Sequence, residues 1–138
     1  MNWKLVLQLS LFGLAMAFAT VLFIPSRVEP FLWLAIFIAV AYVIGASATP
    51  RPFLHGLAIG VVNSVWVTGA HLLFFNQYIA NHAREAEMMR TSPMAGSPRL
   101  MMAITGPVIG VVSGVILGVF AVVAAKMLAG RTRAPQPT

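Results

Sequence analysis

The chain has 138 residues, of which 59% are hydrophobic and only 9% are charged, and its mean hydropathy is +0.89. Water-soluble domains carry roughly 25% charged residues, so this composition excludes an ordinary soluble domain. Nine Lys and Arg residues against three Glu residues give a formal charge of +6. The basic residues stand at the ends of apolar blocks rather than in one cluster, which favours anionic lipid headgroups over nucleic acid as their partner. The lack of cysteine excludes disulfides, iron–sulfur clusters and thiolate zinc sites.

Four long apolar blocks follow one another along the chain, at about residues 5–24, 31–48, 53–79 and 100–128. Each is at least as long as the roughly 18 residues that suggest a helix spanning a ~30 Å hydrocarbon core. No block alternates polar and apolar residues as the strands of a membrane barrel do. The sequence therefore predicts an all-α, polytopic membrane protein. A single domain over residues 1–130 would contain four transmembrane helices packed as an antiparallel bundle.

Two polar segments accompany these blocks. Residues 80–99 form the predicted outer loop, in which residues 83–90 are good helix formers, with Asn81 as a possible cap and Pro93 as a stop. Residues 131–138 are polar and rich in proline, which predicts a disordered cytoplasmic tail. Pro107, near the start of the fourth block, is tolerated in a first helical turn but would kink a helix that begins earlier.

The distribution of basic residues indicates the orientation in the membrane. Four crossings place both termini on one side. That side would carry five basic residues, namely Lys4, Arg51, Lys126, Arg131 and Arg133. The other side would carry four, namely Arg27, Arg84, Arg90 and Arg99. Because cytoplasmic loops carry the excess of Lys and Arg, we predict a multi-pass protein of the bacterial inner membrane with both termini in the cytoplasm.

Small residues recur at steps of four in the last two blocks. The fourth block has Gly106, Gly110, Gly114 and Gly118. The third block has Gly56, Gly60, Ser64 and Thr68. Residues four apart lie on one helix face, and in lipid a face of small residues permits close backbone approach. This glycine zipper predicts helix packing, either between these two blocks, between copies in a homo-oligomer, or around a pore. In the first case we expect the two small-residue faces to meet.

Polar residues accompany the small-residue face of the third block. Asn63 flanks it, and His71 lies about 20° from Ser64 around the helix. His71 is the only ionisable side chain predicted well inside a crossing, and such residues are functional hypotheses by default. Three interpretations stay open: a structural histidine that donates to a backbone carbonyl or to Asn63, a group that handles protons or a ligand, and a metal or haem ligand.

Cofactor sites have little support in the sequence. His55 and His71 are sixteen residues, roughly 24 Å, apart on one predicted helix, so they cannot share a haem. Thioether ligands select Cu(I), and a group of methionines with His82 lies near the predicted outer side: Met88, Met89, Met94, Met101 and Met102. Because methionine is also a common filler of apolar gaps, we predict neither a metal site nor a cofactor.

The absence of several chemical groups from the sequence narrows the range of possible functions. No carboxylate is predicted inside a crossing, so the acidic coupling group of proton-driven small multidrug exporters is missing. No phosphate-binding loop and no Ser–His–acid set is present. We therefore predict a protein that is not an enzyme, an accessory or assembly subunit that contacts lipid and either a membrane-protein partner or its own copies. The alternative is a small homo-oligomeric transporter or channel with a pathway lined by Asn63, Ser64, Thr68 and His71. A third interpretation, an enzyme acting on lipid or quinone, would use His71 or His82 as a base.

Overall fold

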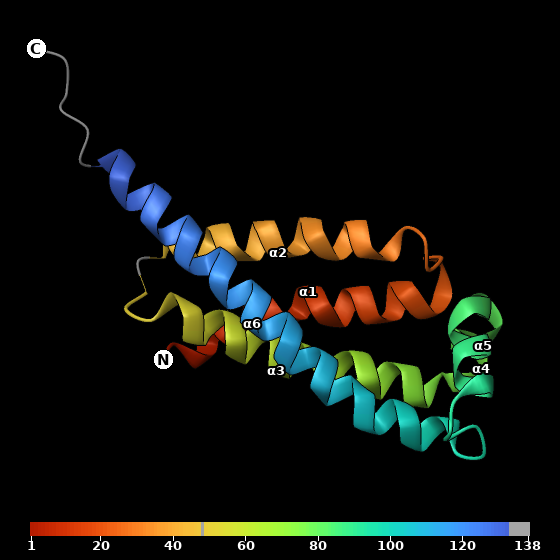
Figure 1. Cartoon of the computed structure of the whole chain (residues 1–138). Helices are drawn as coiled ribbons and strands as arrows, with labels where there is room; N and C mark the ends of the chain where they lie inside the picture. The colour runs from red at the N-terminus through yellow and green to blue at the C-terminus, as the bar shows by residue number, and fades with distance from the viewer. Residues whose placement is uncertain (48, 133–138) are drawn as a thin grey trace, which may run out of the picture.

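The computed structural model describes residues 1–47 and 49–132, and all regular structure within them is helical (Figure 1). The helices are α1 (Trp3–Leu22), α2 (Glu29–Ala46), α3 (Pro52–Leu73), α4 (Phe75–Asn81), α5 (Ala83–Thr91) and α6 (Pro98–Thr132). Of the predicted tail, residues 131 and 132 belong to α6, and residues 133–138 lie outside the described residues.

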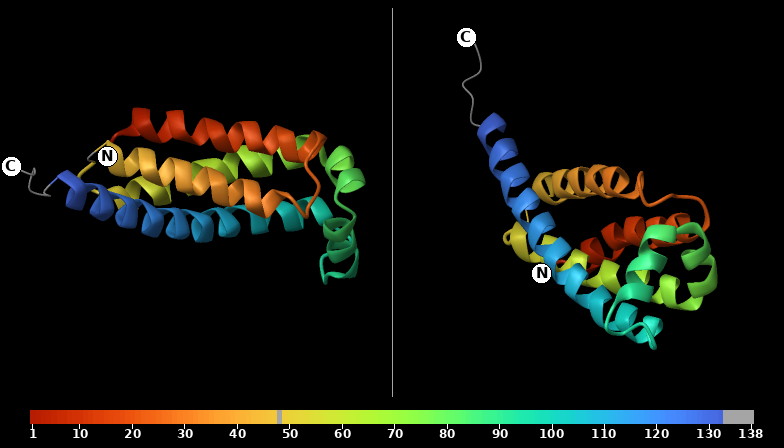
Figure 2. Two further views of the ribbon diagram at one scale, coloured as in Figure 1. Left: turned by 90° about the horizontal axis from the view of Figure 1, so that it is seen from above. Right: turned by 45° about the vertical axis from the view of Figure 1, so that its right-hand side comes forward.

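Four of the helices are long and apolar enough to cross a membrane: α1, α2, α3 and α6. They form an antiparallel bundle in which α1 and α3 run in one direction and α2 and α6 in the other (Figures 1 and 2). The N-terminus and the last turns of α6 lie at the same end of this bundle (Figure 1). The predicted fold class is confirmed: the chain is a multi-pass helical membrane protein.

Several helices begin at prolines. Pro52 and Pro98 are the first residues of α3 and α6, and Pro30 is the second residue of α2. Proline is tolerated there because the first helical N–H groups have no partner within the helix. As a result α2 begins before Pro30, and Glu29 lies in its first turn. The expectation that no carboxylate lies inside a crossing is therefore wrong at the outermost turn of α2.

The third apolar block is not one continuous helix. We expected a helix over residues 53–79, but α3 ends at Leu73 and the chain turns at Phe74 into α4. Residues 72–75 are all apolar, so composition does not indicate where the helix axis changes direction. The turn sends α4 and α5 across the end of the bundle, opposite the N-terminus (Figure 2). It also brings Tyr78 of α4 back onto His71 of α3.

The segment predicted as the outer loop contains the expected helix, but Asn81 does not cap it. α5 covers the predicted helix formers and ends at Thr91, before Pro93. Its N-terminus follows His82 and has no side-chain cap. The side chain of Asn81 instead donates a hydrogen bond of 2.7 Å to the carbonyl of Val21. Asn81 therefore ties the end of α4 to the end of α1 rather than capping α5.

α3 and α6 pack against each other through their small residues. Each step of four along α3 matches a step of four back along α6, which gives the pairs Gly56–Gly118, Gly60–Gly114, Ser64–Gly110 and Thr68–Gly106. A Cβ atom added at Gly60 would overlap the backbone of Gly114, and one added at Gly110 would overlap the side chain of Ser64. The structure thus brings the two small-residue faces together within one chain.

α6 is 35 residues long and carries Pro107 in its interior rather than in its first turn. It runs obliquely across the bundle, beside α3 and over the C-terminal part of α2 (Figure 1). Toward the end of the bundle where the N-terminus lies, α6 contributes Leu117 and Ala121 to a core cluster with Ile44 and Ile59. Near the other end Met102 joins a smaller cluster with Val21 and Tyr78.

Candidate functional site

A cavity of about 680 Å³ occupies the half of the bundle nearest α4 and α5. α2 and α6 are in contact near the opposite end, where a Cβ atom added at Gly45 would lie 2.9 Å from the backbone nitrogen of Ala125. Toward α4 and α5 the two helices separate (Figure 1). The first half of α2, the second half of α3 and the first half of α6 form the walls, and residues of α4 and α5 close the end.

Most of the wall is apolar. Trp33 and Phe37 of α2 face it with their rings stacked edge to face, 6.1 Å apart at the centroids. Leu34 and Ile109 line the cavity while keeping 49% and 62% of their surface exposed. These two residues stand on α2 and α6, so the cavity opens sideways between these helices. In a bilayer that side faces lipid.

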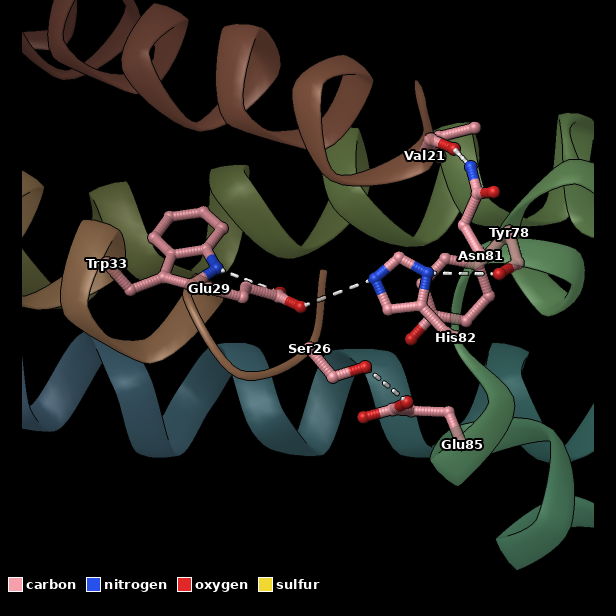
Figure 3. A network of polar contacts seen from close by, with 8 residues as sticks. All are labelled: Val21, Ser26, Glu29, Trp33, Tyr78, Asn81, His82 and Glu85. Carbon is pink, nitrogen blue, oxygen red and sulfur yellow. Dashed lines mark hydrogen bonds and ion pairs between the residues drawn. The ribbon is translucent and has the colours of Figure 1, made fainter. Parts of the chain in front are cut away.

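The carboxylates of the cavity lie at its closed end. Glu29 accepts a hydrogen bond of 3.1 Å from the indole N–H of Trp33. Its other carboxylate oxygen lies 3.8 Å from Nε2 of His82 (Figure 3), which is longer than a hydrogen bond. Glu85 accepts a hydrogen bond of 2.7 Å from the hydroxyl of Ser26 (Figure 3). Both carboxylates belong to the cavity lining.

Three aromatic rings stack beside these carboxylates. The rings of His71 and Tyr78 have centroids 4.1 Å apart and planes 23° apart. Those of Tyr78 and His82 are 4.3 Å and 19° apart. Nδ1 of His82 lies 3.0 Å from the carbonyl of Tyr78, which fixes a proton on that nitrogen because a carbonyl only accepts. Burial, followed by the nearby carboxylates of Glu29 and Glu85, raises the pKa of the Tyr78 phenol, so this ring stays neutral at physiological pH.

Two buried imidazole nitrogens have no hydrogen-bond partner among the described residues: Nε2 of His71 and Nε2 of His82. Only 7% of the His71 surface is exposed, and this residue lines the cavity. The bond from His71 to Asn63 or to a backbone carbonyl, one of the three interpretations, is not among the hydrogen bonds of the described residues. Buried polar atoms normally have a partner, so the unpartnered nitrogen of His71 is unusual; because this nitrogen is itself buried, a ligand atom would reach it only after neighbouring side chains move.

The predicted pathway residues Asn63, Ser64, Thr68 and His71 all line the cavity. Most of them are also engaged in packing. The amide of Asn63 lies against Gly13 of α1, where an added Cβ would overlap it. The hydroxyl of Ser64 donates to the carbonyl of Val61, and Thr68 fills the space over Gly106. Two members of this set have a buried side-chain atom without a hydrogen-bond partner among the described residues, Oδ1 of Asn63 and Nε2 of His71.

Other predicted residues divide between the cavity and the helix contact. Gly60, Gly106 and Gly110 belong to the lining, where α3 and α6 form its floor. Gly56, Gly114 and Gly118 are buried in the contact of these two helices outside the lining. Of the methionines considered as copper ligands, four line the cavity, namely Met88, Met89, Met101 and Met102. Met94 does not.

Sequence reasoning missed Glu29, Tyr78 and Glu85 as site residues. A signal for the ring stack was present: His71, Tyr78 and His82 are spaced by seven and four, which places them on one helical face. A signal for Glu29 was its position four residues before Trp33, a spacing at which helical side chains meet. Glu85 had no comparable signal, because its place in the cavity depends on the direction in which α5 leaves α4.

No group of three or more His, Asp or Glu side chains within the described part of the chain is placed to hold a metal ion. No protein-family model, no curated protein and no solved structure matches the chain. The fold and the site together define a helical membrane protein with four spanning helices and a cavity that opens toward lipid.

Proposed function

We propose that this protein is a non-catalytic membrane protein that binds an amphipathic small molecule in the cavity between α2, α3 and α6. The observation that carries the proposal is the form of the cavity. Its volume of about 680 Å³ is within the range of pockets for drug-sized ligands, roughly 300–1,000 Å³. Apolar walls that open toward lipid suit a hydrocarbon tail, and the polar closed end suits a polar head.

An amphiphile would enter from the bilayer through the side opening between Leu34 and Ile109. Its tail would lie against Phe37, and its head would reach His71 at the closed end. Binding of this kind is compatible with an accessory subunit, which would hold a lipid-like molecule for a membrane-protein partner. It is also compatible with a homo-oligomer.

A small homo-oligomeric transporter is a second candidate, favoured by the four pathway residues in the cavity lining. Beyond Gly60, however, the backbones of α3 and α6 are in direct contact at Gly56 and Gly118. Passage to the other side of the membrane would require these helices to separate. Binding without transport therefore has the stronger support.

We further propose that both termini lie in the cytoplasm of a bacterial cell, so that α4 and α5 face the outside of its inner membrane. The chain has no cysteine, so Gly96→Cys creates a single thiol in the exposed segment between α5 and α6. An impermeant thiol reagent should label this variant in intact cells. Protection in intact cells, with labelling after lysis, would reverse the orientation.

Photolabelling tests the binding proposal. The probe is a neutral dodecyl alcohol with a photoreactive diazirine at the end of its chain, added to the protein in nanodiscs of phosphatidylcholine. Labelling should be saturable and should map by mass spectrometry to cavity residues such as Phe37 and Ile109. Unlabelled dodecanol should compete for the labelling.

A pair of variants on α3 provides the control. Val67 lines the cavity, whereas Val65, two residues before it, is 64% exposed and lies outside the lining. Val67→Trp should fill the cavity and abolish saturable labelling, while Val65→Trp should leave it unchanged. Labelling spread evenly over all exposed helix faces, and equal in both variants, would overturn the proposal.

A further inference from the structure

We infer that the molecule held in the cavity is a single-chain amphiphile with a positively charged ammonium head, bound beside the carboxylates of Glu29 and Glu85 and the unpartnered nitrogen of His71. This inference rests on the proposed binding function and names the chemical class of the ligand. It commits to a free amine or quaternary ammonium compound rather than to a phospholipid of the bilayer.

The charge of the lining is the first argument. Two carboxylates and no Lys or Arg are found among the residues that line the cavity. The described ion pairs leave both carboxylates without a basic Lys or Arg partner, since Glu29 approaches only His82 and the Arg90 pair belongs to Glu87. Carboxylates that face an apolar space without a cation are complementary to a ligand cation. An anionic head would lack the Arg or Lys donors that normally bind it.

The aromatic groups are the second argument. Trp33 and Tyr78 line the same end of the cavity as the two carboxylates. The ring face of Trp33 attracts cations, as in sites that recognise quaternary ammonium groups, whereas both faces of Tyr78 are covered by His71 and His82. Trp33 is also fixed against Glu29 by the hydrogen bond from its indole N–H. One head can therefore contact a carboxylate and an aromatic ring at the same time.

The buried imidazole is an independent third argument. His71 is 7% exposed, lines the cavity and has an Nε2 without a partner among the described residues. One face of the His71 imidazole ring is covered by the ring of Tyr78, at a centroid distance of 4.1 Å. This Nε2 nitrogen is itself buried, so an ammonium N–H would donate to it only after neighbouring side chains move. A primary or secondary amine has such an N–H, whereas a quaternary ammonium does not.

The size of the cavity distinguishes a single chain from a phospholipid. A volume of about 680 Å³ corresponds to one drug-sized molecule. A second acyl chain would lie outside the opening between Leu34 and Ile109, among other lipids, and would gain nothing from the cavity walls. We therefore expect single-chain amines to bind in preference to two-chain lipids that also carry an ammonium.

Three probes with the same photoreactive dodecyl chain test the head group: an ammonium, a sulfate and the neutral alcohol. In phosphatidylcholine nanodiscs, the concentration for half-maximal labelling of cavity residues should be about tenfold lower for the ammonium probe than for the alcohol. The sulfate probe should bind more weakly than the alcohol. An equal or higher affinity for the sulfate would overturn the inference.

Isosteric variants connect the preference to the two carboxylates. Glu29→Gln and Glu85→Gln should each weaken the ammonium probe about three- to tenfold relative to the alcohol probe, whose labelling should stay saturable. The alcohol probe thereby reports that the cavity is still folded. Glu87→Gln is the matched control, because Glu87 lies on α5 outside the lining and pairs with Arg90. A similar loss in all three variants would show a general effect of charge and would overturn the assignment to the cavity carboxylates.

Two outcomes separate this inference from the function on which it rests. If all three probes label the cavity saturably with equal affinity, the binding function stands and the ammonium inference is wrong. If none labels it saturably, both are wrong. Competition by phosphatidylethanolamine as strong as that by dodecylamine would overturn the single-chain assignment.

Discussion

The imidazole of His71 lies stacked on the phenol ring of Tyr78, with centroids 4.1 Å apart, although the two residues belong to different helices. Tyr78 is 7% exposed and has His82 on its other face. This one ring therefore fastens α4 to the end of α3 and closes the cavity. We expect the position of α4 and α5 to depend on it.

Tyr78→Ala should detach α4 and α5 from the bundle, because it removes a buried ring with two stacking partners. The expected loss is about 2–4 kcal/mol in the free energy of unfolding, measured from the shift of the SDS unfolding midpoint. Tyr78→Phe keeps the stack and should lose less than about 1.5 kcal/mol. Equal losses in the two variants would mean that the hydroxyl, and not the ring, holds α4.

The raised pKa of Tyr78 predicts a dependence of stability on pH. Burial favours the neutral phenol in the folded protein, so its pKa there is above the ordinary value of 10.0. A tyrosine in the unfolded chain ionises near 10. The stabilisation is thus complete below pH 10 and declines as pH rises above it. Tyr78→Phe should remove this component, so the difference in unfolding free energy between wild type and Tyr78→Phe should change between pH 9 and pH 11 and stay constant between pH 7 and pH 9.

Gly60→Ala should disrupt the contact between α3 and α6. An added Cβ would overlap the backbone of Gly114, which cannot move aside as a side chain can. We expect a loss of about 1–3 kcal/mol in the free energy of unfolding. Gly69→Ala on the same helix is the control, since nothing lies within 4 Å of its added Cβ. That variant should be neutral or more stable by about 0.4–1 kcal/mol.

Asn81→Ala should weaken the attachment of α4 and α5 to the bundle without affecting the spanning helices. It removes the hydrogen bond of 2.7 Å to the Val21 carbonyl, and one such bond contributes about 0.5–1.5 kcal/mol. Amide hydrogen exchange in α4 and α5 should become several times faster, with no change in α2 or α6. Asn76→Ala, at an exposed position of α4, should not have this effect. A uniform increase of amide hydrogen exchange throughout the bundle would contradict the prediction that this hydrogen bond holds only α4 and α5.

His55→Leu should release the start of α1. Nε2 of His55 accepts a hydrogen bond of 3.0 Å from the backbone N–H of Asn2, and Nδ1 lies 2.8 Å from the Arg51 carbonyl. Leucine fills the buried space but removes the partner of the Asn2 N–H; because Asn2 is exposed and this N–H can bond water, the expected loss is about 0.5–1.5 kcal/mol. Faster hydrogen exchange at residues 2–6 would report this change. Unchanged exchange there would show that α1 is held by its apolar contacts alone.

The sequence alone determined the four spanning helices and the small-residue faces of α3 and α6, while the structure decided that these faces meet each other within one chain. In lipid a long apolar segment must satisfy its own backbone hydrogen bonds, so it forms a helix. Spacing by four residues places Gly56 and Gly60 on one face of α3, and Gly110 and Gly114 on one face of α6, so that these faces can approach closely. Both features depend on local spacing, which can be read without a fold.

Tertiary structure alone decided the site. The turn at Phe74 lies within a run of apolar residues that gives no sign of it, yet it brings Tyr78 within stacking distance of His71 and places Glu85 in the cavity. Glu29 faces the same space because α2 begins one residue before its proline. The physical reason is that a cavity is bounded by residues from several helices, and the directions of those helices are fixed by packing between distant segments rather than by the residues near each turn.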